Sequence, residues 1–108
     1  AVLFEDASGL INYEDGSPII DSSLDGYRKL KRVGAGRVEL ASEGINFHAG
    51  KSFFRYDFRK VETLKIGRNY FVLFIQGSPA ARLFLFDAET PFLHQVRKGL
   101  EIYLKDGG

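Results

Sequence analysis

The chain has 108 residues, of which 44% are hydrophobic and 27% are charged, and its formal net charge is +1. This composition is typical of one globular domain and excludes a disordered or fibrous protein. Cysteine is absent, which excludes disulfides and thiolate metal sites, and no apolar run reaches the roughly 18–20 residues that span a bilayer.

Charge is distributed unevenly along the chain. Residues 1–27 contain six acids and no lysine or arginine, so all fifteen basic residues lie from Arg28 onward. We interpret residues 1–26 as an acidic leader of strand and turn that packs on a domain formed by residues 27–108. A weakly basic body of this kind docks anionic partners, holds the leader against itself, or simply carries ordinary surface charge.

Alternating apolar and polar residues between turn signals predict a meander of six or seven antiparallel strands after the leader. Leader included, the expected strands are Val2–Glu5, Gly9–Tyr13, Tyr27–Val33, Arg37–Ala41, Ile45–His48, Lys51–Phe58, Val61–Ile66, Tyr70–Gln76 and Ala81–Phe86. Gly34-Ala35-Gly36 is expected to be a flexible hairpin turn. Tyr70–Gln76 is so apolar that it must be covered on both faces or twist through the core. The alternation assigns four phenylalanines to the interior: Phe47, Phe54, Phe58 and Phe74.

One helix is predicted at the end of the chain. Thr90 can cap its first turn, and Pro91 suits the first helical position. Spacings of three and four residues give an apolar stripe made of Phe92, Val96, Leu100, Tyr103 and Leu104. Gly99 lies beside this stripe and costs about 1 kcal/mol relative to alanine, which predicts a close approach of the helix to the sheet.

Three segments resemble pleckstrin-homology-like domains, especially GRAM domains and their bacterial relatives. Gly36–Phe47 resembles their strand-turn-strand element, and Tyr56–Val61 resembles the start of their second sheet. Arg82–Phe86, followed by the predicted helix, resembles their last strand and capping helix. The resemblance covers about residues 27–105. It implies a mainly β fold, an antiparallel barrel of six or seven strands capped by the C-terminal α-helix.

The sequence contains no catalytic or cofactor-binding motif that withstands inspection. Gly50-Lys51-Ser52 lacks the first glycine of a phosphate-binding loop and is predicted to lie between strands. His48 and His94 have no carboxylate at metal-binding spacing on their own elements. We therefore expect no catalytic activity of this domain, no cofactor and no metal.

Basic residues around the predicted first hairpin form the candidate site. Phosphoinositide-binding domains of the resembled class gather cations at the corresponding hairpin, and each such residue near anionic lipid contributes about 1 kcal/mol. The proposed headgroup ligands are Arg28, Lys29, Lys31, Arg32, Arg37, Lys51 and Arg55.

The leading hypothesis is a non-catalytic interaction module that binds anionic lipid headgroups or a protein partner. A second hypothesis is an accessory domain of a larger, lipid-metabolic or membrane-associated enzyme, packed on a neighbouring domain of the same chain. A third is peptide capture by strand addition at an open sheet edge. Nucleic acid is not an expected partner because the net charge is near zero. The expected location is the cytoplasm, peripheral at the membrane.

Overall fold

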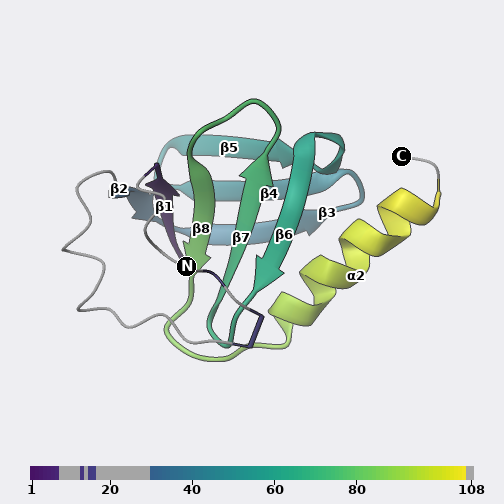
Figure 1. Cartoon of the computed structure of the whole chain (residues 1–108). Helices are drawn as coiled ribbons and strands as arrows, with labels where there is room; N and C mark the ends of the chain where they lie inside the picture. The colour runs from purple at the N-terminus through teal and green to yellow at the C-terminus, as the bar shows by residue number, and fades with distance from the viewer. Residues whose placement is uncertain (8–12, 14, 17–29, 107–108) are drawn as a thin grey trace.

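The structure is a computed structural model and describes residues 1–7, 13, 15–16 and 30–106. The elements in this part of the chain are eight strands, a short 3-10 helix and one α-helix (Figure 1). They are β1 (Val2–Asp6), β2 (Leu30–Ala35), β3 (Arg37–Ala41), β4 (Gly44–Ala49), β5 (Ser52–Asp57), η1 (Phe58–Lys60), β6 (Val61–Ile66), β7 (Tyr70–Ile75), β8 (Ala81–Leu85) and α2 (Phe92–Lys105).

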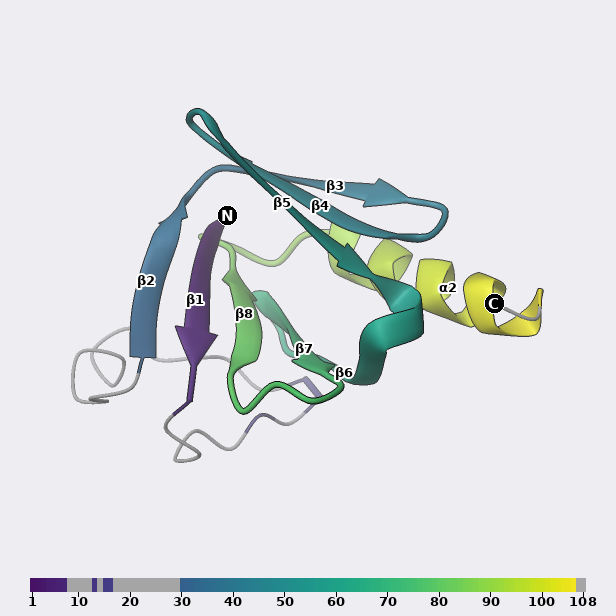
Figure 2. The same ribbon diagram turned by 90° about the horizontal axis from the view of Figure 1, so that it is seen from above.

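The strands form two antiparallel sheets that face each other. One has five strands in the order β2-β1-β8-β7-β6, and the other has three in the order β3-β4-β5. Strands of one sheet cross over those of the other (Figures 1 and 2). The predicted mainly β fold with a C-terminal helix is confirmed, but the two sheets are separate, so the barrel-like sandwich is not a closed barrel.

The predicted hairpin turn at residues 34–36 is wrong. β2 pairs with β1 and not with β3, and the chain crosses from one sheet to the other at Gly36. A Cβ atom at Gly36 would lie 2.0 Å from the carbonyl oxygen of His48, so only glycine fits at this crossing. The alternation of residues could not indicate this crossing, because the partner strand of β2 is β1, which lies far away in the leader.

The main core lies between the two sheets. Ile45 and Phe47 of β4 are fully buried there, as the alternation predicts. They face Leu3, Phe71, Leu73 and Phe84 of the five-stranded sheet. The Phe71 and Phe84 rings are stacked with centroids 4.5 Å apart. The sheets are thus held by apolar burial and aromatic packing.

A second cluster covers the other face of the five-stranded sheet. Tyr70, Val72 and Leu83 are buried there together with Tyr13 of the leader. The prediction that Tyr70–Gln76 is covered on both faces is therefore confirmed. Phe74 is half-buried and packs on this second cluster, not in the main core.

The described parts of the leader belong to the sheet and its outer cover. β1 lies between β2 and β8, and the Tyr13 hydroxyl donates a 2.6 Å hydrogen bond to the buried Asp6 carboxylate. Asp15 accepts a 2.9 Å hydrogen bond from the backbone N–H of Ile66. The proposed boundary at residues 26 and 27, like the expected strand Gly9–Tyr13 apart from Tyr13 itself, lies outside the described residues.

α2 packs against β3 and β6 and so spans one open corner between the sheets. Thr90 accepts a 3.3 Å hydrogen bond from the Phe92 N–H through its side-chain oxygen. Leu93 and Val96 are the buried residues of the helix, whereas Leu104 is 60% exposed. The predicted stripe is therefore wrong at Leu104 and omits Leu93, because the N-terminal half of α2 lies on the sheets and its end extends beyond them (Figure 2).

The expected close approach at Gly99 is present. A Cβ atom there would lie 3.1 Å from Cδ1 of Leu40 on β3. No helix in the described part of the chain has the length and apolar character needed to cross a membrane.

Candidate interaction site

The two described cations of β2 point to different faces. Arg28 and Lys29 lie outside the described residues. Lys31 and Arg32 are exposed on β2, where Lys31 is level with Glu5 and Arg32 with Phe4. Neighbouring side chains of a strand point to opposite faces, so these two cations diverge.

Two of the other cations are paired with carboxylates. Arg37 lies 3.7 Å from Glu39, and Arg55 lies 2.8 Å from Asp57 and 3.6 Å from Glu43. The hydrogen bond between Arg55 and Asp57 raises the pKa of the guanidinium and lowers the pKa of the carboxyl. Lys51 is exposed in the β4–β5 turn.

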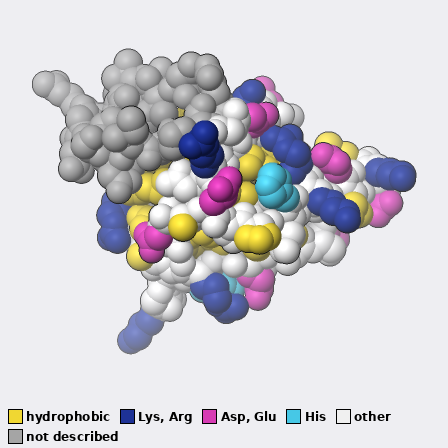
Figure 3. All heavy atoms as spheres, turned by 90° about the horizontal axis from the view of Figure 1, so that it is seen from below, with side chains coloured by type: hydrophobic (Ala, Val, Ile, Leu, Met, Phe, Trp, Pro, Cys, Tyr) yellow, Lys and Arg dark blue, Asp and Glu magenta, His cyan; other side chains and the backbone are white. Residues whose placement is uncertain are grey.

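The face seen from below shows the same mixing of charge. Lysine and arginine side chains alternate there with aspartate and glutamate (Figure 3). Exposed ion pairs of this kind contribute little to stability, and they reduce the positive potential available to an anionic ligand.

The most distinctive feature is the free edge of β5, the uppermost strand of the three-stranded sheet in Figure 1. All six β5 residues pair with β4 without a register shift. Just beyond the strand, the Phe58 N–H donates to the Glu43 carbonyl at 2.9 Å. Hydrogen-bonded and non-hydrogen-bonded residue pairs alternate in an antiparallel ladder. This bond therefore tells which residues of β5 form backbone hydrogen bonds to β4.

The alternation leaves three residues with outward backbone groups. Phe54 and Tyr56 are directed to β4, whereas the N–H and C=O of Phe53, Arg55 and Asp57 point away from it. Among the described residues, no backbone group bonds to these three N–H groups. The edge of β5 is therefore a row of free donors and acceptors.

The other three sheet edges are less suitable for pairing. α2 packs on β3 and β6. The register of β6 also shifts between Val61 and Thr63, and the β1–β2 ladder shifts between Leu3 and Phe4. Bulges and covering helices are the usual protection of an edge strand, and β5 has neither within the described part of the chain.

The outer face of β3-β4-β5 carries an aromatic and polar cluster beside this edge. Phe53 is 55% exposed, and its ring lies 5.0 Å from that of His48. Glu39 accepts a 3.3 Å hydrogen bond from the Asn46 amide and lies 3.6 Å from His48. The hydrogen bond from Asn46 lowers the pKa of Glu39, and nearby His48 lowers it further.

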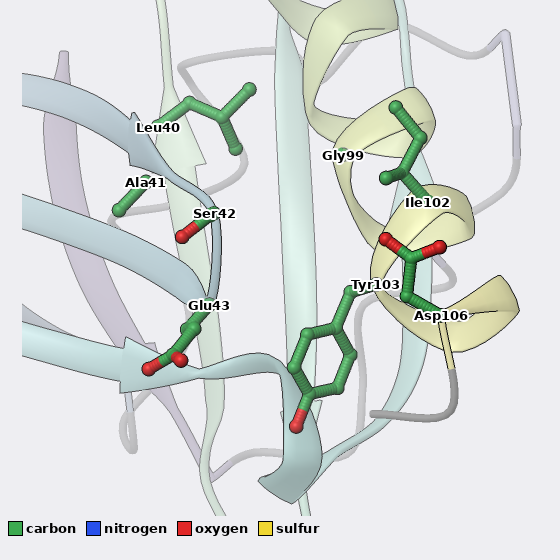
Figure 4. Close-up of a pocket in the computed structure, with 8 residues that line it drawn as sticks. All are labelled: Leu40, Ala41, Ser42, Glu43, Gly99, Ile102, Tyr103 and Asp106. Atoms are coloured by element: carbon green, nitrogen blue, oxygen red, sulfur yellow. The ribbon is translucent and has the colours of Figure 1, made fainter.

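A groove opens beyond the C-terminal end of β5, between the β3–β4 turn and α2 (Figure 4). Its volume is about 560 Å³. One side is formed by residues of β3 and its turn, and the other by the C-terminal half of α2: Leu40, Ala41, Ser42 and Glu43, then Gly99, Ile102, Tyr103 and Asp106. Glu43 and Tyr103 also line a smaller polar hollow with Arg55, Asp57 and Arg59. The polar hollow thus lies between the groove and the edge of β5.

Within the described residues, no three histidine, cysteine, aspartate or glutamate side chains are grouped to hold a metal ion. His48 lies on β4 beside Phe53, and His94 lies on α2 in a hollow with Arg68 and Arg97.

Residues 1–99 match the model of a family described as a domain of unknown function, DUF8783. The chain belongs to this family. No curated protein matches the chain. No solved structure matches it either.

In this DUF8783 member, the sequence revealed only part of the site. Strand alternation predicts that Phe54 points inward, and Phe54 is indeed partly buried between exposed Phe53 and Arg55. The free edge of β5 was not located, because an edge depends on sheet order. The groove has a single sequence signal, Gly99, whose absent side chain leaves room beside Leu40.

Proposed function

We propose that this domain is a non-catalytic interaction module that binds an extended peptide segment by strand addition at the edge of β5. The observation that carries the proposal is the outward row of backbone groups on Phe53, Arg55 and Asp57. In strand addition the main-chain bonds provide affinity, and alternate side chains provide selectivity. Exposed Phe53 supplies an aromatic contact on the outer face, and the groove lined by Tyr103 can receive residues beyond the strand.

The arrangement of charge favours a peptide over a lipid headgroup. Anionic headgroups are held by cations that gather on one face. Here Lys31 and Arg32 diverge, and Arg55 is neutralised by Asp57.

Backbone-specific variants test the proposal. Peptides are first selected from a displayed library of random extended sequences and then titrated into the labelled domain. Arg55→Pro removes an outward N–H without breaking a bond to β4, because the N–H of Arg55 does not point to β4. We expect it to weaken peptide binding by roughly tenfold, since a hydrogen bond is lost and the ring obstructs the new strand.

Arg55→Ala is the matched control, because it removes the same side chain and keeps the N–H. Binding should change by less than about threefold, the effect of an exposed ion pair. In the unmodified domain, amide shifts and exchange protection should be largest at Phe53, Arg55 and Asp57. Shifts confined to loops, or equal effects of the two variants, would contradict strand addition.

A vesicle experiment tests the headgroup alternative. The domain is sedimented with vesicles that contain phosphatidylserine, at low salt. Retention that disappears on charge reversal at Lys31, Arg32 and Arg37, with no peptide selected from the library, would replace our proposal with lipid binding.

A further inference from the structure

The outer-face residues along the edge of β5 form a sequence that complements itself. Phe53, Arg55 and Asp57 belong to the strand, and exposed Lys51 precedes them in the β4–β5 turn. We infer that the β5 edge of one chain pairs with the β5 edge of a second copy, antiparallel and centred on Phe54. This inference rests on the proposed function, because it assigns an occupant to the same edge.

Centring on Phe54 brings opposite chemistries together. Lys51 lies level with Asp57 of the second copy, and Phe53 lies level with its Arg55. Each arrangement occurs twice across the twofold axis, as an isologous contact requires. An ammonium beside a carboxylate and a guanidinium beside an aromatic ring are both favourable cross-strand neighbours.

The backbone pattern is satisfied by the same register. Phe53 and Arg55 both present outward N–H and C=O groups. Phe53 of each copy can therefore exchange two hydrogen bonds with Arg55 of the other copy. Phe54 of one copy then faces Phe54 of the other on the inner side of the sheet. No group at the centre of the edge is left without a partner.

Neighbouring registers are worse. Centring on Arg55 sets the two guanidinium groups against each other, and centring on Phe53 sets Lys51 against Arg55, so both juxtapose like charges. Centring on Tyr56 restores an Arg55–Asp57 match but runs the strand into η1, which begins at Phe58. The charges and the end of the strand at η1 together favour the register centred on Phe54.

The product would be a continuous six-stranded sheet made from the three-stranded sheets of two copies. A contact limited to one edge strand is small, so the dimer should be weak and concentration-dependent. It would also cover the peptide-binding edge, so self-association and peptide capture would compete.

Charge-swapped variants test the inference by sedimentation velocity over a dilution series. Lys51→Glu alone places two carboxylates opposite each other at each end of the contact, and Asp57→Lys alone places two ammonium groups there. Each variant should raise the dimer dissociation constant by about tenfold. Mixing the two variants allows a mixed dimer in which one end of the contact joins two unmodified side chains and the other joins two substituted ones of opposite charge. We therefore expect the mixture to associate as the unmodified chain does, while each variant alone associates about tenfold more weakly.

The outcomes separate this inference from the proposed function. An unmodified chain that stays monomeric at its highest soluble concentration, or a dimer that Arg55→Pro and both charge variants leave intact, would overturn self-pairing. Peptide capture is decided separately, by whether selected peptides shift the Phe53, Arg55 and Asp57 amides of the monomer. Circular dichroism of each variant confirms that a lost dimer is not a lost fold.

Discussion

Replacing Gly99 by alanine should stabilise the domain, although this glycine lies where α2 approaches the sheet. The new methyl group would lie 3.1 Å from Cδ1 and 3.4 Å from Cδ2 of Leu40. Optimal carbon–carbon separations are about 3.5–4.0 Å, so Leu40 must retreat by a few tenths of an ångström. Leu40 is only half-buried and lines the open groove, so it has space to do so.

The helical preference of alanine then makes the change in the free energy of unfolding favourable. Alanine in a helix interior is favoured over glycine by about 0.8–1.0 kcal/mol. After the cost of moving Leu40, we expect a gain of about 0.5–1 kcal/mol in the free energy of unfolding. For a domain of this size the gain corresponds to a rise in Tm of about 4 °C.

Urea denaturation monitored by circular dichroism measures this change, and an unaltered m-value shows that the unfolding transition is otherwise the same. The control is the same substitution in a Leu40→Ala background, where the full alanine preference should appear. If Gly99→Ala destabilises the unmodified chain but stabilises the Leu40→Ala chain, Leu40 is fixed and our description of the groove is wrong. Destabilisation in both backgrounds would refute the packing of α2 itself.

Three further predictions concern the sheets. Gly36→Ala should prevent folding, because its methyl group would lie 2.0 Å from the backbone oxygen of His48. The expected observation is loss of the cooperative urea transition, and a folded variant would contradict the close passage of the chain at Gly36. Phe84→Ala should cost about 3–5 kcal/mol by urea denaturation, since its buried ring contacts Phe71, and a cost below about 1 kcal/mol would contradict its burial. Asp57 has a folded-state pKa below its unfolded value, so its pairing with Arg55 stabilises the domain above about pH 4 and is lost as pH falls further. An NMR titration should show this carboxyl's pKa rising in Arg55→Ala, and an unchanged pKa would exclude the ion pair.

Local periodicity was enough to find the strands and the helix. Arg37–Ala41 and Val61–Ile66 have the predicted limits, and α2 begins two residues after Thr90. These segments alternate or repeat strictly, and turn residues separate them, so each carries its own information. The burial of Ile45 and Phe47 followed from the same alternation.

Pairing between distant segments was not available from local patterns. β2 and β3 are consecutive along the chain and lie in different sheets, whereas β1 pairs with β8 across most of the sequence. The expected hairpin at residues 34–36 is therefore absent, and Arg32 and Arg37 lie in different sheets. The candidate site moved to β5, because a free edge is a property of sheet order.

The position of β1 also bears on how the domain is made by a ribosome. Its register runs from Val2 opposite Leu85 to Asp6 opposite Ala81, so β1 needs a partner that is synthesised much later than β1 itself. Such distant contacts carry a cost in loop-closure entropy and slow the folding of the chain. While β8 has not yet emerged from the ribosome, one side of β1 remains unpaired. The five-stranded sheet can therefore form only after β8 has been synthesised.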